Sequence, residues 1–324
     1  MLSTANPGFG QYVGRILPTD TGDGWAFGAG GGQIVGSDFR GAVLWEGPDF
    51  EYRYLEAEGF KSWGLLGVGG GQQVGSGYLG GSMNHPLMWS GTSESVVDLY
   101  AGGFSSHAYG TDGKSQVGDK GVVLGGNVSH ALLWRGTAES VVELHPDGFE
   151  WSIAYGVWGD RQVGNAQNTP IMWSGTAESA TVLPVPKGSQ GGGAGAIHGD
   201  QIVGDIGIDG TSVAIIWDAD TGEYTTLGGG FAEDTNGRQQ VGTSRNRATV
   251  WSGTEESKLD LHQFLPGGFL ESRATGIDEN GTIVGWGVDM NAIRPLVWTP
   301  VPEPSSLLAL GAALAVVALR KRDV

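Results

Sequence analysis

The stretch RQVGNAQNTPIMWSGTAESATVL, residues 161–183, decides the fold of this chain. It holds a Gln-Val-Gly segment, an apolar run that ends at Trp173, a polar turn and a second apolar run that ends at Leu183. With residues 154–157 before it, the unit contains four short apolar segments separated by Gly and polar turns. Such a pattern predicts four β-strands, at 154–157, 162–164, 170–173 and 180–183.

The same unit recurs seven times along the chain. Its glycine returns about every 41 residues, a length that is typical of a four-stranded propeller blade. The repeat glycines are Gly36, Gly75, Gly118, Gly164, Gly204, Gly242 and Gly285, and the tryptophans that follow them are Trp45, Trp89, Trp134, Trp173, Trp217, Trp251 and Trp298. We therefore predict an all-β, seven-bladed β-propeller of four-stranded blades over residues 9–300.

A four-stranded blade cannot bury its faces alone, so each blade needs a large apolar side chain toward its neighbour. We expect the seven repeat tryptophans to fill this role in the core. Five further tryptophans fall outside the repeat register and are better candidates for exposed contacts: Trp25, Trp63, Trp151, Trp158 and Trp286.

The last repeat lacks its fourth strand, because Pro300 and Pro302 follow soon after Trp298. Residues 13–18, Val-Gly-Arg-Ile-Leu-Pro, align with residues 141–146, which form the fourth strand of another unit. This match predicts that the N-terminal segment completes the last blade and closes the ring, which leaves no open sheet edge. The alternative takes residues 11–14 as an eighth second strand, so that the chain begins inside a blade.

Composition supports an all-β fold and excludes several functions. Gly makes up 60 of 324 residues, which disfavours helices, whereas 12 Trp are too many for a disordered chain. The formal net charge of −17 argues against nucleic acid as a partner. The absence of Cys excludes disulfides and thiolate chemistry.

The units resemble extracellular repeats named for a His-Ala-Phe element that precedes Leu-Trp. The nearest copies are residues 130–134, His-Ala-Leu-Leu-Trp, and residues 85–89, His-Pro-Leu-Met-Trp; the third residue is not Phe in either. The resemblance implies a surface or secreted β-propeller.

The last 24 residues, 301–324, form a separate segment. Pro302, Glu303 and Pro304 precede an apolar run over residues 307–319, and a basic cluster follows, made of Arg320, Lys321 and Arg322. This order resembles the PEP-CTERM sorting signal of Gram-negative bacteria. The resemblance implies an exosortase partner that processes the chain near the Pro-Glu-Pro element, and it makes these six residues the predicted sorting signal.

Residues 305–319 predict a short hydrophobic helix of roughly 22 Å, shorter than a membrane core of ~30 Å. We expect it to hold the chain only transiently in the inner membrane, with the basic cluster on the cytoplasmic side. Exported proteins of this kind normally carry a secretion signal, and residues 1–7 do not resemble one. Export is therefore inferred from the C-terminal segment alone.

No catalytic, cofactor-binding or metal-binding residues are predicted. Residues 218–223, Asp-Ala-Asp-Thr-Gly-Glu, have part of a calcium-loop pattern but lie where other units have a hairpin turn, so a turn is the preferred interpretation and weak calcium binding the alternative. The six His are expected not to cluster, because His85 and His130 share one repeat position in different blades and His145 and His262 share another; this favours structural roles. Glu94, Glu139, Glu178 and Glu256 share one hairpin position and are expected to be solvated.

The leading hypothesis is a non-enzymatic binding or structural module, exported to the cell surface or extracellular matrix, with a polysaccharide or matrix protein as its partner. The alternative is a carbohydrate-active hydrolase or lyase on the same ring. That enzyme would need carboxylates that break the repeat and converge at the channel mouth. The residues that break the pattern are Asp205, Asp209, Arg273 and Asp289.

Overall fold

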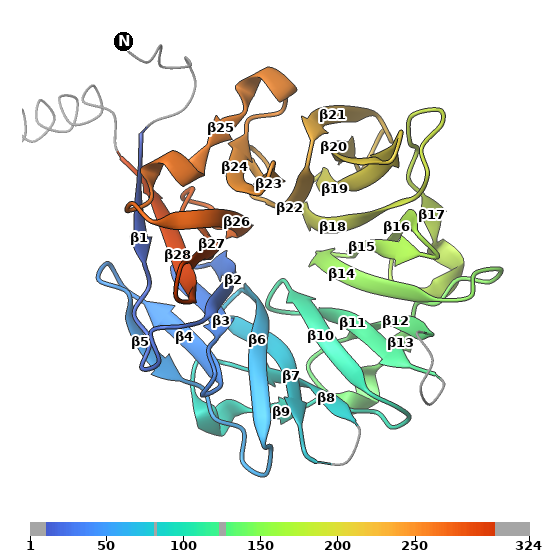
Figure 1. The fold of residues 1–324 in the computed structure, drawn as a ribbon. Helices are drawn as coiled ribbons and strands as arrows, with labels where there is room; N and C mark the ends of the chain where they lie inside the picture. Colours follow the sequence, from blue (N-terminus) through green and yellow to red (C-terminus); the bar gives the residue numbers. More distant parts are fainter. Residues whose placement is uncertain (1–10, 81–82, 123–127, 302–324) are drawn as a thin grey trace, which may run out of the picture.

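The computed structural model describes residues 11–80, 83–122 and 128–301. They form a closed ring of seven antiparallel four-stranded sheets, the blades, with β2, β6, β10, β14, β18, β22 and β26 nearest the axis (Figure 1). From the innermost strand outward, the blades are as follows: blade 1, β2 (Trp25–Gly30), β3 (Gln33–Ser37), β4 (Ala42–Glu46) and β5 (Glu51–Tyr54); blade 2, β6 (Ser62–Gly69), β7 (Gln72–Tyr78), β8 (Asn84–Trp89) and β9 (Val97–Asp98); blade 3, β10 (Ser106–Thr111), β11 (Gln116–Gly121), β12 (Ser129–Trp134) and β13 (Val142–Glu143); blade 4, β14 (Ser152–Trp158), β15 (Arg161–Ala166), β16 (Thr169–Trp173) and β17 (Thr181–Val182); blade 5, β18 (Gly192–His198), β19 (Gln201–Ile208), β20 (Thr211–Asp218) and β21 (Tyr224–Gly229); blade 6, β22 (Phe231–Thr235), β23 (Gln240–Ser244), β24 (Arg247–Trp251) and β25 (Leu259–Asp260); blade 7, β26 (Phe269–Ile277), β27 (Ile283–Asp289), β28 (Ile293–Pro300) and β1 (Tyr12–Ile16).

The predicted seven-bladed, four-stranded propeller is confirmed. Short 3-10 turns follow the third strands of four blades and the fourth strand of blade 6: η1 (Ser93–Ser95), η2 (Ala138–Ser140), η3 (Ala177–Ser179), η4 (Glu255–Ser257) and η5 (Leu261–Phe264). In the part of the chain that the structure describes, no helix has the length and apolar character that a membrane crossing needs. The helix predicted at 305–319 lies outside the described residues.

The two ends of the ring meet in blade 7. β1 pairs antiparallel with β28, in a register that runs from Tyr12 opposite Pro300 to Ile16 opposite Leu296 (Figure 1). The N-terminal strand thus supplies the outer strand that the last repeat lacks, as predicted. The alternative of an eighth blade is wrong, because residues 12–14 pair with the edge of β28.

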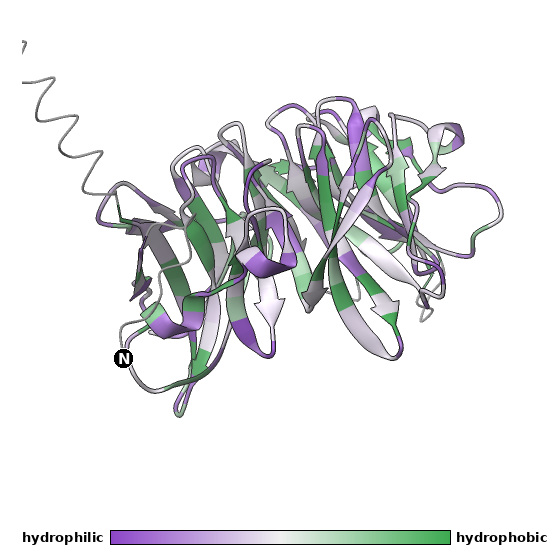
Figure 2. Ribbon diagram, turned by 90° about the horizontal axis from the view of Figure 1, so that it is seen from above, coloured by the Kyte–Doolittle hydropathy of each residue, from purple (hydrophilic) through white to green (hydrophobic). Residues whose placement is uncertain are grey.

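The repeat tryptophans form the core between blades. All seven are at most 1% exposed, and hydrophobic residues run along the strands while hydrophilic ones gather in the loops (Figure 2). Four indoles also donate to a backbone carbonyl at the outer edge of the preceding blade: Trp45 to Pro18 (2.7 Å), Trp89 to Glu56 (3.0 Å), Trp217 to Pro184 (2.6 Å) and Trp298 to Leu261 (2.9 Å). Each such tryptophan therefore both packs against and hydrogen-bonds to the neighbouring blade.

The repeat glycine is required by a β-bulge on the innermost strand. In blade 3 the pairing slips between Ala108 and Gly110, and a Cβ on the facing Gly118 would lie 1.8 Å from the carbonyl oxygen of His107. The other six repeat glycines would meet an inner-strand carbonyl at 1.8–2.0 Å. No side chain fits at these positions.

The glutamine of the repeat has a local partner. Gln162 Oε1 accepts a hydrogen bond of 2.8 Å from the amide of Gly175 in the hairpin turn of the same blade. Equivalent bonds of 2.8 Å join Gln73 to Gly91, Gln116 to Gly136 and Gln240 to Gly253. The blades with Ile34, Ile202 or Ile283 at this position lack the Gly-Thr turn. Glutamine and turn therefore occur as a pair.

The close contact at the repeat glycine makes a side chain there destabilising. Gly118→Ala should lower the free energy of unfolding by more than about 3 kcal/mol, because the new Cβ must displace backbone. Denaturant unfolding of the full chain, followed by tryptophan fluorescence, measures this. Gly267→Ala is the control, since a Cβ there meets no atom within 4 Å, and it should stay within about 0.5 kcal/mol of the native chain. Equal stability of the two variants would contradict the role assigned to the bulge.

Candidate functional site

Each innermost strand carries one extra residue at its bulge. In chain order these residues are Phe27, Leu66, Tyr109, Tyr155, Gly195, Glu233 and Thr275, one from each blade. All are partly exposed. Blade 5 alone has a glycine here, and it also has Gly192 and Gly193 earlier in the strand. The inner edge of this blade therefore carries almost no side chain.

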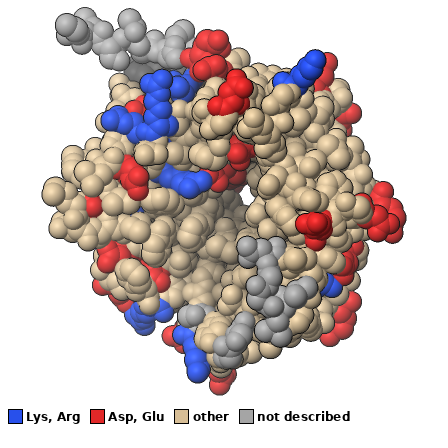
Figure 3. All heavy atoms as spheres, turned by 45° about the vertical axis from the view of Figure 1, so that its right-hand side comes forward, with Lys and Arg blue, Asp and Glu red and all other residues tan. Residues whose placement is uncertain are grey.

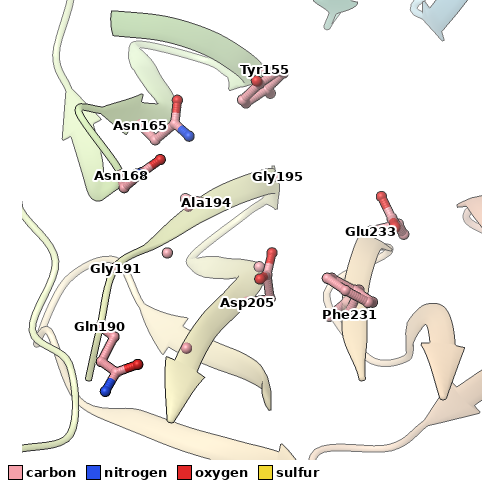
Figure 4. Close-up of a pocket in the computed structure, with 15 residues that line it drawn as sticks. Tyr155, Asn165, Asn168, Gln190, Gly191, Ala194, Gly195, Asp205, Phe231 and Glu233 are labelled. Atoms are coloured by element: carbon pink, nitrogen blue, oxygen red, sulfur yellow. The ribbon is translucent and has the colours of Figure 1, made fainter. Parts of the chain in front are cut away.

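A cavity of about 520 Å³ lies over this glycine-rich strand. Its lining includes Tyr155 and Asn165 from blade 4, Asp205 from blade 5, and Phe231 and Glu233 from blade 6, which surround one open space (Figure 4). Asn168, in the turn between β15 and β16, and Gln190, in the linker before β18, also line it. The cavity thus opens on the face of the ring that carries the links between blades.

Glu233 and Arg273 form an ion pair across the boundary between blades 6 and 7. Arg273 Nε donates to Glu233 Oε1 at 3.0 Å, its Nη2 contacts the same oxygen, and the guanidinium carbon lies 5.8 Å from the Phe231 ring centroid. Acidic and basic side chains are visible beside the central opening (Figure 3). The positive charge of Arg273 is therefore already engaged by a carboxylate.

Asp205 has no such partner. Among the described residues, no hydrogen bond or ion pair reaches its side chain. Burial first and the nearby Glu233 carboxylate second raise its pKa, Arg273 opposes them, and the resulting pKa is about 6. Asn165 Oδ1 is also buried without a hydrogen-bond partner. The buried Asn165 Oδ1 is thus an acceptor on the cavity wall without a partner, which costs free energy, and the partly buried Asp205 carboxyl lines the same cavity without a protein donor.

Asp234, the neighbour of Glu233, has a structural role. Its Oδ2 accepts from the amide of Ile277 in blade 7 at 2.9 Å, and its Oδ1 accepts from the amide of Thr235 at 2.8 Å. Burial raises the pKa of this carboxyl to about 7. The side chain joins two inner strands where the other blades have Gly or Ala.

The structure brings together two of the four residues that break the repeat. Asp205 and Arg273 lie on opposite sides of Glu233, which the sequence analysis did not single out. Asp209 lies in the turn between β19 and β20, and Asp289 instead pairs with Arg294 at 2.9 Å. The signal that could have located the cavity is the run Gly192–Gly193–Ala194–Gly195, the only inner strand in which Gly replaces the bulge side chain.

The histidines are engaged in local contacts, but one expectation about them is wrong. His130 and His145, expected not to cluster, stack with ring centroids 3.7 Å apart, because His130 lies in β12 and His145 follows β13, the strand that pairs with β12. His130 also forms an ion pair with Glu143. Burial, the larger cause, and the charge of His130, the smaller one, lower the pKa of His145. His85 pairs with Asp98 at 2.8 Å.

The acidic turn at residues 218–223 is closed by its own hydrogen bonds. Asp218 Oδ1 accepts from the amides of Asp220 (3.0 Å) and Thr221 (2.8 Å), so it caps its own turn. Within the described ranges no three or more His, Asp or Glu side chains are grouped so that they could hold a metal ion. The hairpin glutamates Glu94, Glu139, Glu178 and Glu256 are exposed. The predicted sorting residues, Pro302, Glu303, Pro304, Arg320, Lys321 and Arg322, lie outside the described residues.

Comparison with known families finds one match: the PEP-CTERM protein-sorting motif, over residues 300–322. This motif implies processing by an exosortase and an exported, cell-surface protein. No curated protein matches the chain.

Solved propellers share the fold. TolB from Acinetobacter baumannii superposes with a TM-score of 0.52 at 12% identity, over 88% of this chain and 68% of its own. The extracellular domain of a protein assigned as a hybrid two-component system of B. thetaiotaomicron gives 0.60 at 8% identity, over 91% and 40%. The β-propeller domain of the Trilobed protease from Pyrococcus furiosus gives 0.54 at 10% identity, over 85% and 93%. At these identities the likeness establishes the fold alone.

The unpartnered carboxyl gives a pH-dependent stability prediction. Because the folded-state pKa of Asp205 lies near 6, above its ordinary value of 3.8, the fold favours the protonated form. Asp205→Asn should therefore raise the free energy of unfolding by about 1–2 kcal/mol at neutral pH, and the gain should vanish below about pH 4. Denaturant unfolding of the full chain at several pH values measures this.

The control is Asp209→Asn, which removes the same charge from an exposed turn and should show no comparable gain. A loss of stability in Asp205→Asn at neutral pH would mean that the carboxylate is satisfied in the fold.

Proposed function

We propose that this chain is an exosortase-sorted surface protein whose propeller is a non-enzymatic binding module, with its ligand at the cavity over blade 5. The observation that carries the proposal is the pairing of the sorting motif at residues 300–322 with a closed ring that precedes it directly. The motif gives the destination, and the cavity over blade 5 offers polar groups without a protein partner. The resemblance to extracellular His-Ala-Phe repeats supports the same destination.

In this proposal, sorting takes place through membrane insertion, cleavage and release. Residues 305–319 hold the chain briefly in the inner membrane of a Gram-negative cell, the basic cluster Arg320 to Arg322 stays on the cytoplasmic side, and cleavage near Pro302–Pro304 releases the ring. The released protein joins the cell surface or a biofilm matrix. Its partner there is an extracellular polysaccharide or matrix protein, and it needs no cofactor; weak calcium binding at Asp218 and Asp220 is the exception allowed by their charge.

Sorting is tested by localisation in the native host. The intact gene should give a surface or released protein that has lost the mass of its tail, whereas a copy that ends at Pro300 should escape this processing. Glu303→Ala, within the motif, should accumulate unprocessed, and Ser305→Ala serves as the matched control. If the intact protein and the copy that ends at Pro300 both remain in the cytoplasm at full mass, the tail is not a sorting signal.

A second candidate function is favoured by one feature of the cavity. Asp205 has a raised pKa while Glu233 is paired with Arg273, and two carboxyls in different environments are the arrangement that glycoside hydrolysis uses as acid and base or nucleophile. A carbohydrate-active hydrolase or lyase is therefore the alternative. Release of new reducing ends from a polysaccharide by the native chain, lost in Glu233→Gln, would favour the enzyme over the binding module.

A further inference from the structure

We infer that the cavity over blade 5 binds a polysaccharide of amino sugars, with a free ammonium group on Asp205 and a sugar ring beside Tyr155. This inference deepens the binding role proposed above and rests on it. It is carried by the charge, hydrogen-bonding capacity and shape of the cavity.

The charge of the cavity is negative and incompletely compensated. Its lining contains two carboxylates, Asp205 and Glu233, and no basic residue; Arg273, which pairs with Glu233, lies outside the lining. Asp234, which follows Glu233 in β22, accepts hydrogen bonds from two backbone amides. Asp205 is thus the carboxylate left to pair with an incoming cation, which it would hold by a charge-assisted hydrogen bond.

The polar groups of the lining that have no protein partner favour a ligand rich in hydrogen-bond donors. Asp205 and the buried Asn165 Oδ1 are both acceptors without a partner, and the side-chain amides of Asn168 and Gln190 line the same cavity without a hydrogen bond to described residues. A sugar that carries ammonium and hydroxyl groups supplies N–H and O–H donors to such acceptors. An acidic polysaccharide would instead place its carboxylates against Asp205.

The aromatic rings and the volume favour a sugar chain over a single lysine side chain. Tyr155 and Phe231 border the cavity from two blades, and such rings attract cations and pack against the apolar face of a sugar. A volume of about 520 Å³ lies in the range of small-ligand sites, and one lysine side chain would leave most of it empty. The net charge of −17 would also draw a cationic polymer toward the ring.

Calorimetry with the purified full chain tests the inference. The probes are two oligomers of equal length, one of β-linked glucosamine and one of its N-acetylated form, at about pH 6.5 in about 150 mM salt, which screens long-range attraction. The glucosamine oligomer should bind at least tenfold more tightly than the neutral one.

Three variants locate the site. Asp205→Asn should weaken binding of the glucosamine oligomer at least tenfold. Gly195→Tyr should abolish binding, because it places in the cavity the residue that blade 4 carries at Tyr155, and its Cβ would meet nothing closer than 3.4 Å. Glu139→Gln removes one negative charge from an exposed turn of blade 3 and should bind as the native chain does. Unfolding curves of all three verify that they are folded.

Equal affinity for the two oligomers, equal binding by Asp205→Asn and Glu139→Gln, or no binding of either oligomer by the folded native chain would each overturn the inference. None of these results would alter the localisation of the intact and truncated chains, so failure of the ligand assignment is distinguishable from failure of the proposed sorting. Shortening of the glucosamine oligomer by the native chain, detected by mass spectrometry, would overturn the inference in favour of the hydrolase.

Discussion

The contact between each repeat tryptophan and the outer edge of the preceding blade is the interaction on which this ring depends. A four-stranded sheet of about 40 residues has two apolar faces and cannot bury them alone. The indole covers one face, and in four blades it also fixes the neighbour through its N–H. Where the two ends of the ring meet, Trp45 of blade 1 makes the same contact with Pro18, which lies shortly after β1 of blade 7. Ring closure therefore uses the ordinary contact between blades, together with the pairing of β1 and β28.

The bulge on each innermost strand explains why the repeat can be recognised in the sequence. The bulge pushes a carbonyl toward the second strand, so the second strand must carry Gly at one register position in all seven blades. A backbone constraint of this kind leaves an invariant residue, whereas the position two residues earlier varies with the turn, as Ile34 and Gln73 show. The fold, the blade number and the closure could be predicted because each depends on a pattern repeated within the chain.

The candidate site could be predicted only in part, and for a physical reason. Asp205 and Arg273 stand out because they break the repeat, but Glu233 occupies an ordinary bulge position whose residue varies from blade to blade. Its partner is 40 residues away in the next blade, at a distance that only the curvature of the ring determines. The pairing of the ends in blade 7 followed from alignment, but the stacking of His130 on His145 required the register of β12 and β13.

Blade 5 differs from its neighbours in a way that packing does not explain. Gly at 192, 193 and 195 weakens a strand, since Gly gives up conformational freedom and buries no side chain. The same blade holds Asp205 in a setting that disfavours its charged form, and across the cavity in blade 4 the buried Asn165 Oδ1 has no hydrogen-bond partner. The glycines and the buried Asn165 Oδ1 each lower stability around this cavity, and natural proteins tolerate such costs at functional sites. Six blades have a side chain at the bulge position. Blade 5 has Gly195 there, and a cavity lies over its innermost strand. The repeat accounts for the scaffold, and the place where the repeat fails is the best indication of where a ligand binds.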